Sequence, residues 1–478
     1  MVSESLYTDR LPRGEVKNVD DRPYDPNKAR ISDIVWYNLD WLQNLEKAGY
    51  FKRPAIMDNI NKSLLCNTEY LGYDAFECPK CGNGNLVFHK CHSRFCNSCG
   101  VKEQKLLAAK VAEMAIDAPH RHIVFTIPFE LRSWFREDRD ALSLLFVAAR
   151  NTICCIINER IYRRLKRSFT PYSDTYYLYQ NFRHQKDFGM IACLHTFGRD
   201  IKWNPHIHAL VPELIYDPDT DSVKSFTHFD FKKLRLTFQY ELLRLMSERF
   251  GDAFKAVKNQ IYHTKKNGFY VYARYTKYDL SETGGREIDN IRNVKDRVNY
   301  IMRYAARPAM AESRIVSFDK ATNMVHWFYH RHEDNVRVDI TESGRSFLKR
   351  LLIHIPDNGF PMVRYYGFYS NREHKTLDRI YALLSQKKHT RLKTLKQRKH
   401  LARIRSMKFR YRTFVMDSYN RDVLLCPCGT IMEFVGCYNP LKGISNDDRY
   451  RRDCINEMRD MWLRRRSTGM GPPGNGRS

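Results

Sequence analysis

The sequence has no hydrophobic run long enough to cross a membrane. None of its apolar stretches reaches the roughly 18 residues that a transmembrane helix needs, and the opening Met-Val-Ser-Glu-Ser-Leu-Tyr lacks the apolar core of a signal peptide. It also has no internal repeat and no glycine-rich loop followed by a phosphate-binding lysine. We therefore expect a cytoplasmic protein with no membrane partner and no nucleotide cofactor.

Acidic residues are scarce relative to basic ones. The 478 residues include 54 Asp and Glu against 81 Lys and Arg, which gives a formal net charge of +27 and a pI near 9.5. Proteins this basic commonly bind a polyanion, so nucleic acid is the leading partner, and a basic surface without such a role is the alternative. The length exceeds what one core holds, so we expect about two to four domains.

Thirteen cysteines would suggest disulfides in a secreted chain, but clustered pairs indicate metal sites in a reducing compartment. Two Cys-x-x-Cys pairs flank residues 82–95 in the pattern of a zinc ribbon, and glycine follows each pair. The predicted thiolate ligands are Cys78, Cys81, Cys96 and Cys99. Three further candidates, Cys66, Cys91 and His92, leave open an exchange of ligands or a second, partial site. Such zinc either holds the fold together or contributes to DNA reading.

A second candidate metal site lies around His206 and His208. Side chains alternate along a strand, so these two imidazoles share a face and can hold one ion between them. Residues 190–195 form an earlier apolar run, and residues 198–204 suit the turn between two strands. A turn near residues 200–202 would set His195 across from the pair and create an open three-histidine site. The alternative is that His206 and His208 are hydrogen-bonded core histidines.

Apolar periodicity predicts an α+β fold with an antiparallel central sheet flanked by helices. Helices are predicted at residues 31–45, 55–65, 101–116, 141–165, 232–250, 289–306 and 341–354, and further strands at residues 120–128, 269–275 and 363–371. Tyr300 and Tyr304 are four residues apart on one of these helices, which stacks their phenols on one face. Alone, such a pair more often belongs to a core.

Four segments resemble, in order, the two-tyrosine HUH transposases of rolling-circle insertion sequences. They are the cysteine cluster that ends in CHSRFCNSCG, the hairpin HTFGRDIKWNPHIHALVP, the helix YIMRYAARPAMAESRI and the run FLKRLLIHIPDNGFPMVRYYGFYSN. The cysteine cluster is similar to the zinc-binding domain that precedes the catalytic domain in this family. The resemblance covers about residues 30–370. The chain departs from the family at CPCG, residues 426–429, where we expect a Cys-x-x-Cys, so a second zinc site at Cys426, Cys428 and Cys437 stays unassigned.

The resemblance implies roles for specific residues. His206 and His208 would be the ligands of a catalytic Mg²⁺ or Mn²⁺, with His195 as the third ligand and Asp200 as the second choice. Tyr300 and Tyr304 would be paired nucleophiles. One phenol would attack single-stranded DNA at the ends of a transposon or at its target, giving a 5′-phosphotyrosine and a free 3′-hydroxyl.

The resemblance also implies a cellular location and a host partner, and it leaves two alternative functions open. We expect a bacterial, nucleoid-associated protein that depends on a host helicase, because the chain has no ATPase motif of its own. Rival interpretations are an HUH replication initiator or relaxase and a non-catalytic zinc DNA-binding regulator. The regulator leaves the histidine hairpin and the tyrosine pair unexplained.

The carboxyl-terminal part is strongly basic. Residues 387–412 contain no acidic residue and intersperse aromatics among the Lys and Arg side chains, which suits a phosphate-tracking helix or arm, with a solvated face as the alternative. The candidate DNA contacts are Arg303, Arg307 and Arg314 near the tyrosines and Lys396, Arg398, Lys399, Arg403 and Arg405 in this run. The expected division is an arm with helices at 1–65, a zinc-binding domain at 66–116, a nuclease domain at 117–316, its carboxyl-terminal part at 317–386, and a basic arm with a disordered tail at 387–478.

Overall fold

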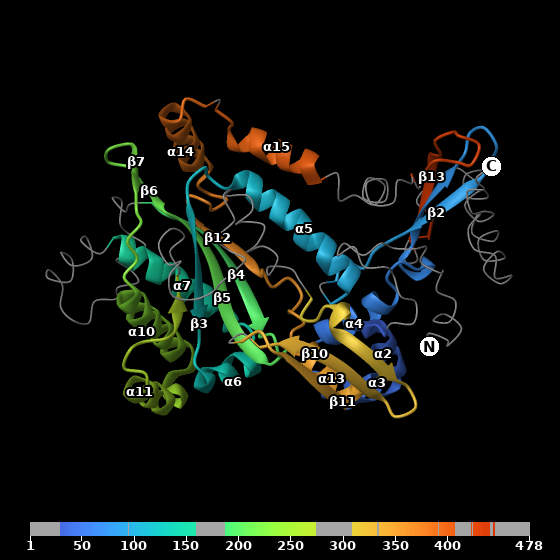
Figure 1. Ribbon diagram of the computed structural model, residues 1–478, viewed down its shortest axis with the longest axis horizontal. Coiled ribbons are helices and arrows are strands. Elements are labelled where there is room, and N and C mark those ends of the chain that lie inside the picture. The colour runs from blue at the N-terminus through green and yellow to red at the C-terminus, as the bar shows by residue number, and fades with distance from the viewer. Residues whose placement is uncertain are drawn as a thin grey trace.

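The computed structural model of the protein describes residues 29–93, 95–158, 187–273, 308–331, 334–390, 392–406, 422, 424–439 and 443–444. Helices and antiparallel sheets alternate through these residues, which confirms the α+β prediction (Figure 1). Within these ranges no helix combines the length and the hydrophobicity needed to span a membrane.

The centre of the molecule is a five-stranded antiparallel sheet in the order β12-β4-β5-β3-β8. Its strands are β3 (His120–Thr126), β4 (Gly189–Phe197), β5 (Trp203–Pro212), β8 (Val271–Tyr272) and β12 (Val363–Gly367). All but the last residue of β4 are buried, because helices cover both faces of the sheet. The predicted hairpin and the strand at residues 120–128 are therefore confirmed.

Alternating side chains separate the two faces of this sheet. Met190, Ala192 and Leu194 pack with one set of helices, whereas Ile191 and Cys193 pack with another. The first set comprises α6 (Phe129–Glu137), α7 (Leu142–Ile157), α10 (Phe231–Phe250) and α11 (Lys255–Thr264). The second comprises α5 (Asn97–Met114), α14 (His374–Lys387) and α15 (Leu395–Ser406). In Figure 1, α5 and α15 run side by side above the sheet.

The amino-terminal helices share a core with a segment far along the chain. Helices α2 (Ile31–Tyr37), α3 (Leu39–Lys47) and α4 (Ala55–Leu64) pack on α13 (Gly344–Leu352) and on a three-stranded sheet. That sheet contains β9 (Ile315–Asp319), β10 (Met324–His330) and β11 (Arg337–Ser343), in the order β11-β10-β9. The helices within residues 29–65, which belong to the separate amino-terminal unit that we expected at residues 1–65, therefore pack against residues 310–355.

Two helix predictions need correction here. The helix predicted at residues 31–45 is divided at Asn38, whose side-chain amide donates to Ile34 O at 2.9 Å and exchanges hydrogen bonds with Asn323. The helix predicted at residues 341–354 starts only at Gly344, because residues 341–343 complete β11. Ser343 then caps the helix by accepting from Ser346 N at 3.2 Å.

A second antiparallel sheet lies away from the centre, in the order β14-β13-β1-β2 (Figure 1). It joins β1 (Tyr73–Glu77) and β2 (Gly84–Phe88) to β13 (Glu433–Asn439) and β14 (Gly443–Ile444). A short hairpin of β6 (Leu214–Asp217) and β7 (Ser222–Ser225) completes the strands. The helix predicted at 289–306, the end of the helix predicted at 141–165 and the end of the strand predicted at 269–275 lie outside the described residues.

The edge strand β12 depends on a close backbone approach at Gly367. Its φ is +58°, and a Cβ at this position would lie 1.6 Å from the carbonyl oxygen of Phe188. Gly367→Ala should therefore lower the free energy of unfolding by at least about 2 kcal/mol, because it adds a backbone clash to the cost of a left-handed φ.

Gly359→Ala is the matched control. Its φ is +76° and a Cβ there meets nothing within 4 Å, so it should cost only about 1 kcal/mol. Urea denaturation of the two variants measures the difference. Equal losses would show that the approach to Phe188 contributes nothing.

Candidate functional site

Three histidines converge on the face of the central sheet that α5 also covers. His195 on β4 pairs directly with His206 on β5, and Cys193 pairs with His208. The ligand nitrogens of His195, His206 and His208 lie within 4.8 Å of one another. The predicted placement of His195 across from the other two is confirmed by this register.

Hydrogen bonds fix which nitrogen of each ring faces the cluster. His206 Nδ1 lies 2.7 Å from Asn204 O, a carbonyl that can only accept, so this nitrogen carries the proton and Nε2 keeps its lone pair. That Nε2 lies 3.0 Å from His208 Nε2. Two imidazole nitrogens directed at each other, with a third ring adjacent, form a donor set that suits a divalent cation.

His122 is a functional candidate that the sequence analysis missed. It lies on β3, and its Nε2 is 2.8 Å from Nδ1 of His208, with the two rings stacked 5.1 Å apart. A metal-ligating histidine commonly uses its second nitrogen in this way, which sets its tautomer and orientation. The signal in the sequence was the His-x-His pattern at residues 120–122, which we interpreted only as part of a strand.

Burial keeps these imidazoles neutral. It lowers the pKa of His206 to about 4 and that of His122 to about 4, and it also lowers the pKa of His208. A histidine must be deprotonated to bind a metal, so the lone pairs are available at neutral pH.

Asp200, the alternative third ligand, lies in the turn after β4. One of its carboxylate oxygens accepts from Lys202 N at 3.2 Å and the other pairs with Lys202 Nζ at 3.2 Å. It is not part of the histidine cluster.

A cavity opens beside His195. It is lined by His195, His354, Phe95 and Pro308, among others. Pro308 is the residue at which the described chain resumes after residues 274–307. The chain therefore returns to the histidine site just beyond the segment that contains the tyrosine pair.

The predicted nucleophiles Tyr300 and Tyr304, together with Arg303 and Arg307, lie outside the described residues. Arg314 is described, and its guanidinium serves the fold: Nε donates to Phe328 O at 2.9 Å, and the group lies 5.5 Å from the Trp327 ring. Burial lowers its pKa to about 10.

The basic helix α15 contains two kinds of charged side chain. Arg398 lies 4.0 Å above the ring of Tyr381 and donates to Glu113 O at 3.3 Å, so it anchors α15 to α14 and α5. Lys396, Lys399 and Arg403 are exposed. Arg405 belongs to the same helix, but its side chain is outside the described set.

The cysteines form two clusters, and the single predicted quartet is therefore wrong. Cys96 and Cys99 lie with Cys66 and Cys91, whereas Cys78 and Cys81 lie with Cys426 and Cys428. The two cysteines of each Cys-x-x-Cys pair lie in the same cluster, as their spacing predicts. The other two cysteines of each cluster come from elsewhere in the chain. His92 joins neither cluster and bonds Glu103 at 3.0 Å, and Cys437 lies instead with Asp74 and His89.

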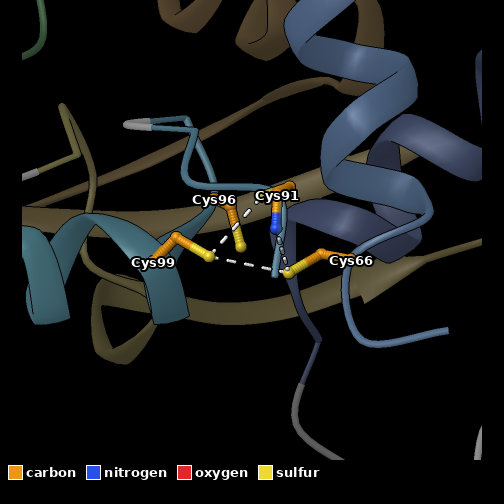
Figure 2. A group of neighbouring side chains, drawn as sticks. All are labelled: Cys66, Cys91, Cys96 and Cys99. Atoms are coloured by element: carbon orange, nitrogen blue, oxygen red, sulfur yellow. Dashed lines mark hydrogen bonds between the residues drawn. The ribbon is translucent and has the colours of Figure 1, made fainter. Parts of the chain in front are cut away.

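The first cluster gathers the end of α4, the segment after β2 and the start of α5 (Figure 2). The sulfur of Cys99 is 3.6 Å from those of Cys66 and Cys91. Four thiolates at a Zn–S distance of about 2.3 Å would be separated by about 3.8 Å, whereas a disulfide needs about 2.05 Å. Backbone N–H groups of Cys91 and Ser93 also face the sulfurs of Cys66 and Cys91, at 3.5 and 3.4 Å. The cluster therefore fits a tetrahedral zinc.

The chain matches two protein families and two curated proteins. Residues 189–376 match the family described as "Putative transposase", and residues 39–127 match the family described as "Transposase zinc-binding domain". The chain is 26% identical to the putative transposase y4qJ of Sinorhizobium fredii over 322 residues, which are 64% of this chain and 73% of that protein. It is 25% identical to the transposase for insertion sequence element IS801 of Pseudomonas savastanoi pv. phaseolicola over 349 residues, which are 72% of this chain and 76% of that protein. No solved structure matches the chain.

The neutral histidines predict an acid-sensitive fold. As pH falls, the unfolded chain takes up a proton at His206 near the ordinary pKa of 6.5, but the folded chain does so only near 4, so stability is lost across that window and is constant above it. For metal-free protein, His206 should contribute a loss of about 2 kcal/mol between pH 8 and pH 5.

Urea denaturation across this pH range, with chelator present, should therefore show a steeper decline for wild type than for His206→Gln. Exchange of the exposed His400 for Gln is the control and should leave the wild-type slope intact. Parallel slopes for wild type and His206→Gln would contradict the assignment of a neutral buried His206.

Proposed function

We propose that this chain, which belongs to the insertion-sequence transposases that join a transposase zinc-binding domain to a transposase domain, nicks and rejoins single-stranded DNA through tyrosine. The transposase domain spans the histidine hairpin and the tyrosine segment, and the zinc-binding domain spans the first cysteine cluster. The observation that carries the proposal is the convergence of His195, His206 and His208 on one face of the sheet.

In this proposal His195, His206 and His208 hold a divalent cation, Mg²⁺ or Mn²⁺. The bound ion would act as a Lewis acid toward the scissile phosphate. The histidines keep their lone pairs directed into the cluster, and Asn204 and His122 hold the rings of His206 and His208 in that orientation.

Tyr300 and Tyr304 are the proposed nucleophiles. A phenol oxygen bonds to phosphorus, the bond to the 3′ oxygen breaks, and the phenol proton is transferred to the leaving oxygen, either directly or through solvent. The 5′-phosphotyrosine retains the energy of the broken bond, so a 3′-hydroxyl can reverse the reaction without a nucleotide. Two tyrosines on one helix face would let two strands be held at once.

The chain path supports this pairing of tyrosine and metal. Pro308 lines the cavity beside His195, and Tyr304 precedes it by four residues. At 3.8 Å per residue, Tyr304 is no more than roughly 15 Å from Pro308 along the chain. This length of chain would let Tyr304 reach a phosphate held beside His195.

The exposed cations of α15 supply the proposed surface for the DNA backbone. Lys396, Lys399 and Arg403 are exposed, and they lie along a helix with no acidic residue. Strand separation would come from a host helicase, since the chain has no nucleotide-binding loop.

The first test is formation of a covalent adduct. Wild-type protein incubated with Mn²⁺ and a labelled single strand that contains the end of its element should give a protein–DNA band that survives denaturation. Tyr300→Phe combined with Tyr304→Phe should abolish that band, because phenylalanine has no nucleophilic oxygen.

Tyr262→Phe is a matched control, since this exposed tyrosine lies on α11, outside the cluster. Its adduct should equal that of wild type. An adduct that persists in the double variant would refute the tyrosine assignment, and wild-type DNA binding without any adduct would favour the regulator.

The second test concerns His122 as a positioning residue. His122→Phe removes the acceptor for His208 Nδ1 and should weaken Mn²⁺ binding by about 10- to 100-fold, as expected when a hydrogen-bond partner of a metal ligand is lost. Mn²⁺ affinity is measured by titration followed by electron paramagnetic resonance.

His122→Gln should recover part of the affinity, because its amide oxygen can accept the same hydrogen bond. Unchanged Mn²⁺ affinity in His122→Phe would show that the contact does not orient His208.

A further inference from the structure

The second cysteine cluster joins two parts of the chain that are far apart in sequence. Cys78 and Cys81 follow β1, whereas Cys426 and Cys428 precede β13. Cys426 and Cys428 lie beyond both matched regions, which end at residues 127 and 376. Neither domain match therefore accounts for this cluster.

The distances in this cluster are those of a metal site. The sulfurs of Cys78 and Cys428 are 3.4 Å apart, as are those of Cys81 and Cys426, and the four sulfurs lie within 4.8 Å of one another. These separations are near the about 3.8 Å expected around a tetrahedral zinc and far from the about 2.05 Å of a disulfide.

Each cysteine pair lies in a tight turn that a glycine closes. Gly82 N donates to Cys78 O at 2.9 Å and Gly429 N donates to Cys426 O at 2.9 Å. Both glycines have positive φ, +70° and +84°, which lets the chain turn back tightly behind the sulfurs. The Cys-x-Cys spacing at residues 426–428 therefore builds a turn like that of the Cys-x-x-Cys at residues 78–81.

Little apolar surface holds this part of the molecule together. Among the described residues, the buried core of the β14-β13-β1-β2 sheet consists of Tyr73, Ala75, Phe88 and Val435, with Leu86 and Tyr438 packed against it. A second cluster adds Met432 and the partly buried Phe76 to two of the cysteines. Cores this small rarely sustain a fold without a metal or a disulfide.

We propose that Cys78, Cys81, Cys426 and Cys428 bind a structural zinc ion that ties the carboxyl-terminal strand β13 to the amino-terminal hairpin of β1 and β2. The four thiolates satisfy the tetrahedral coordination of zinc and leave no open position, so the site is structural. It is distinct from the cluster of Cys66, Cys91, Cys96 and Cys99.

This zinc would link residues 78–81 to residues 426–428 and so join the two ends of the chain between them. Helix α15 packs along α5 at one end of residues 407–421, and the zinc would fix Cys426 at the other. Residues 407–421 contain four Lys and Arg, at positions 408, 410, 412 and 421.

Metal content tests the site directly. Full-length wild type and Cys426→Ser/Cys428→Ser are compared by elemental analysis after purification in reductant. The double variant should contain one zinc ion fewer per chain than wild type, and Cys155→Ser, a cysteine of α7 outside both clusters, should match wild type. Equal zinc in the double variant and wild type would overturn the proposal, as would iron in place of zinc.

Hydrogen–deuterium exchange tests the structural role. In the double variant, β13 should lose protection by at least tenfold in exchange rate while β4 and β5 keep theirs, which also shows that the variant is folded. Cys428→His alone, which retains a zinc-binding side chain, should restore both the zinc and the protection. Protection of β13 that survives loss of this zinc would overturn the proposed role of the metal.

Discussion

The antiparallel register of β4 and β5 determines the candidate active site. Because Cα partners set His195 opposite His206 and Cys193 opposite His208, three imidazoles share one face, and a shift of one residue would send His195 to the other face. Helices bury both faces of this sheet, so a shifted register would place the imidazole of His195 in the apolar core on the opposite face. The packing of the sheet and the geometry of the site are therefore specified by the same alternation.

This part of the structure was predictable because its information is local. The two-residue period of His206 and His208, and the polar run between the strands, predict a hairpin and an approximate turn. The His-x-His pattern at residues 120–122 marks His122 as a candidate, but its contact with His208 depends on the pairing of β3 with β5. The sequence does not specify that β3 is the strand that pairs with the second edge of β5. Helix ends show the same limit: Ser343 could extend a helical pattern, but pairing with Met324 places it in β11.

The cysteines separate local from long-range information most clearly. The two Cys-x-x-Cys pairs have a spacing and a following glycine that predict metal-binding turns, and Gly82 N and Gly100 N close these turns by donating to Cys78 O and Cys96 O. Which cysteines share one ion depends on the tertiary structure. Here the pairing of β13 with β1 brings Cys426 and Cys428 to the pair that follows β1. The end of α4 places Cys66 beside the start of α5. Proximity in sequence suggested the wrong combination. Charge density alone also does not show that Arg314 and Arg398 contact the rest of the fold, because only their surroundings show those contacts.

Helix α5 connects the first cysteine cluster to the central sheet that holds the histidine site. Cys96 is its N-cap and Cys99 lies in its first turn. At its other end, Tyr381 OH donates to the carbonyl of Met114, its last residue, at 2.5 Å, and Ile116 N donates to Tyr369 OH at 3.0 Å. The same tyrosine hydroxyl, on Tyr369, lies 2.8 Å from His120 on β3, two residues before His122. A zinc ion that fixes the start of α5 therefore positions a rigid helix whose other end is bonded to the sheet of the histidine site. The zinc-binding domain thus constrains how α15, which packs along α5, is oriented toward that site.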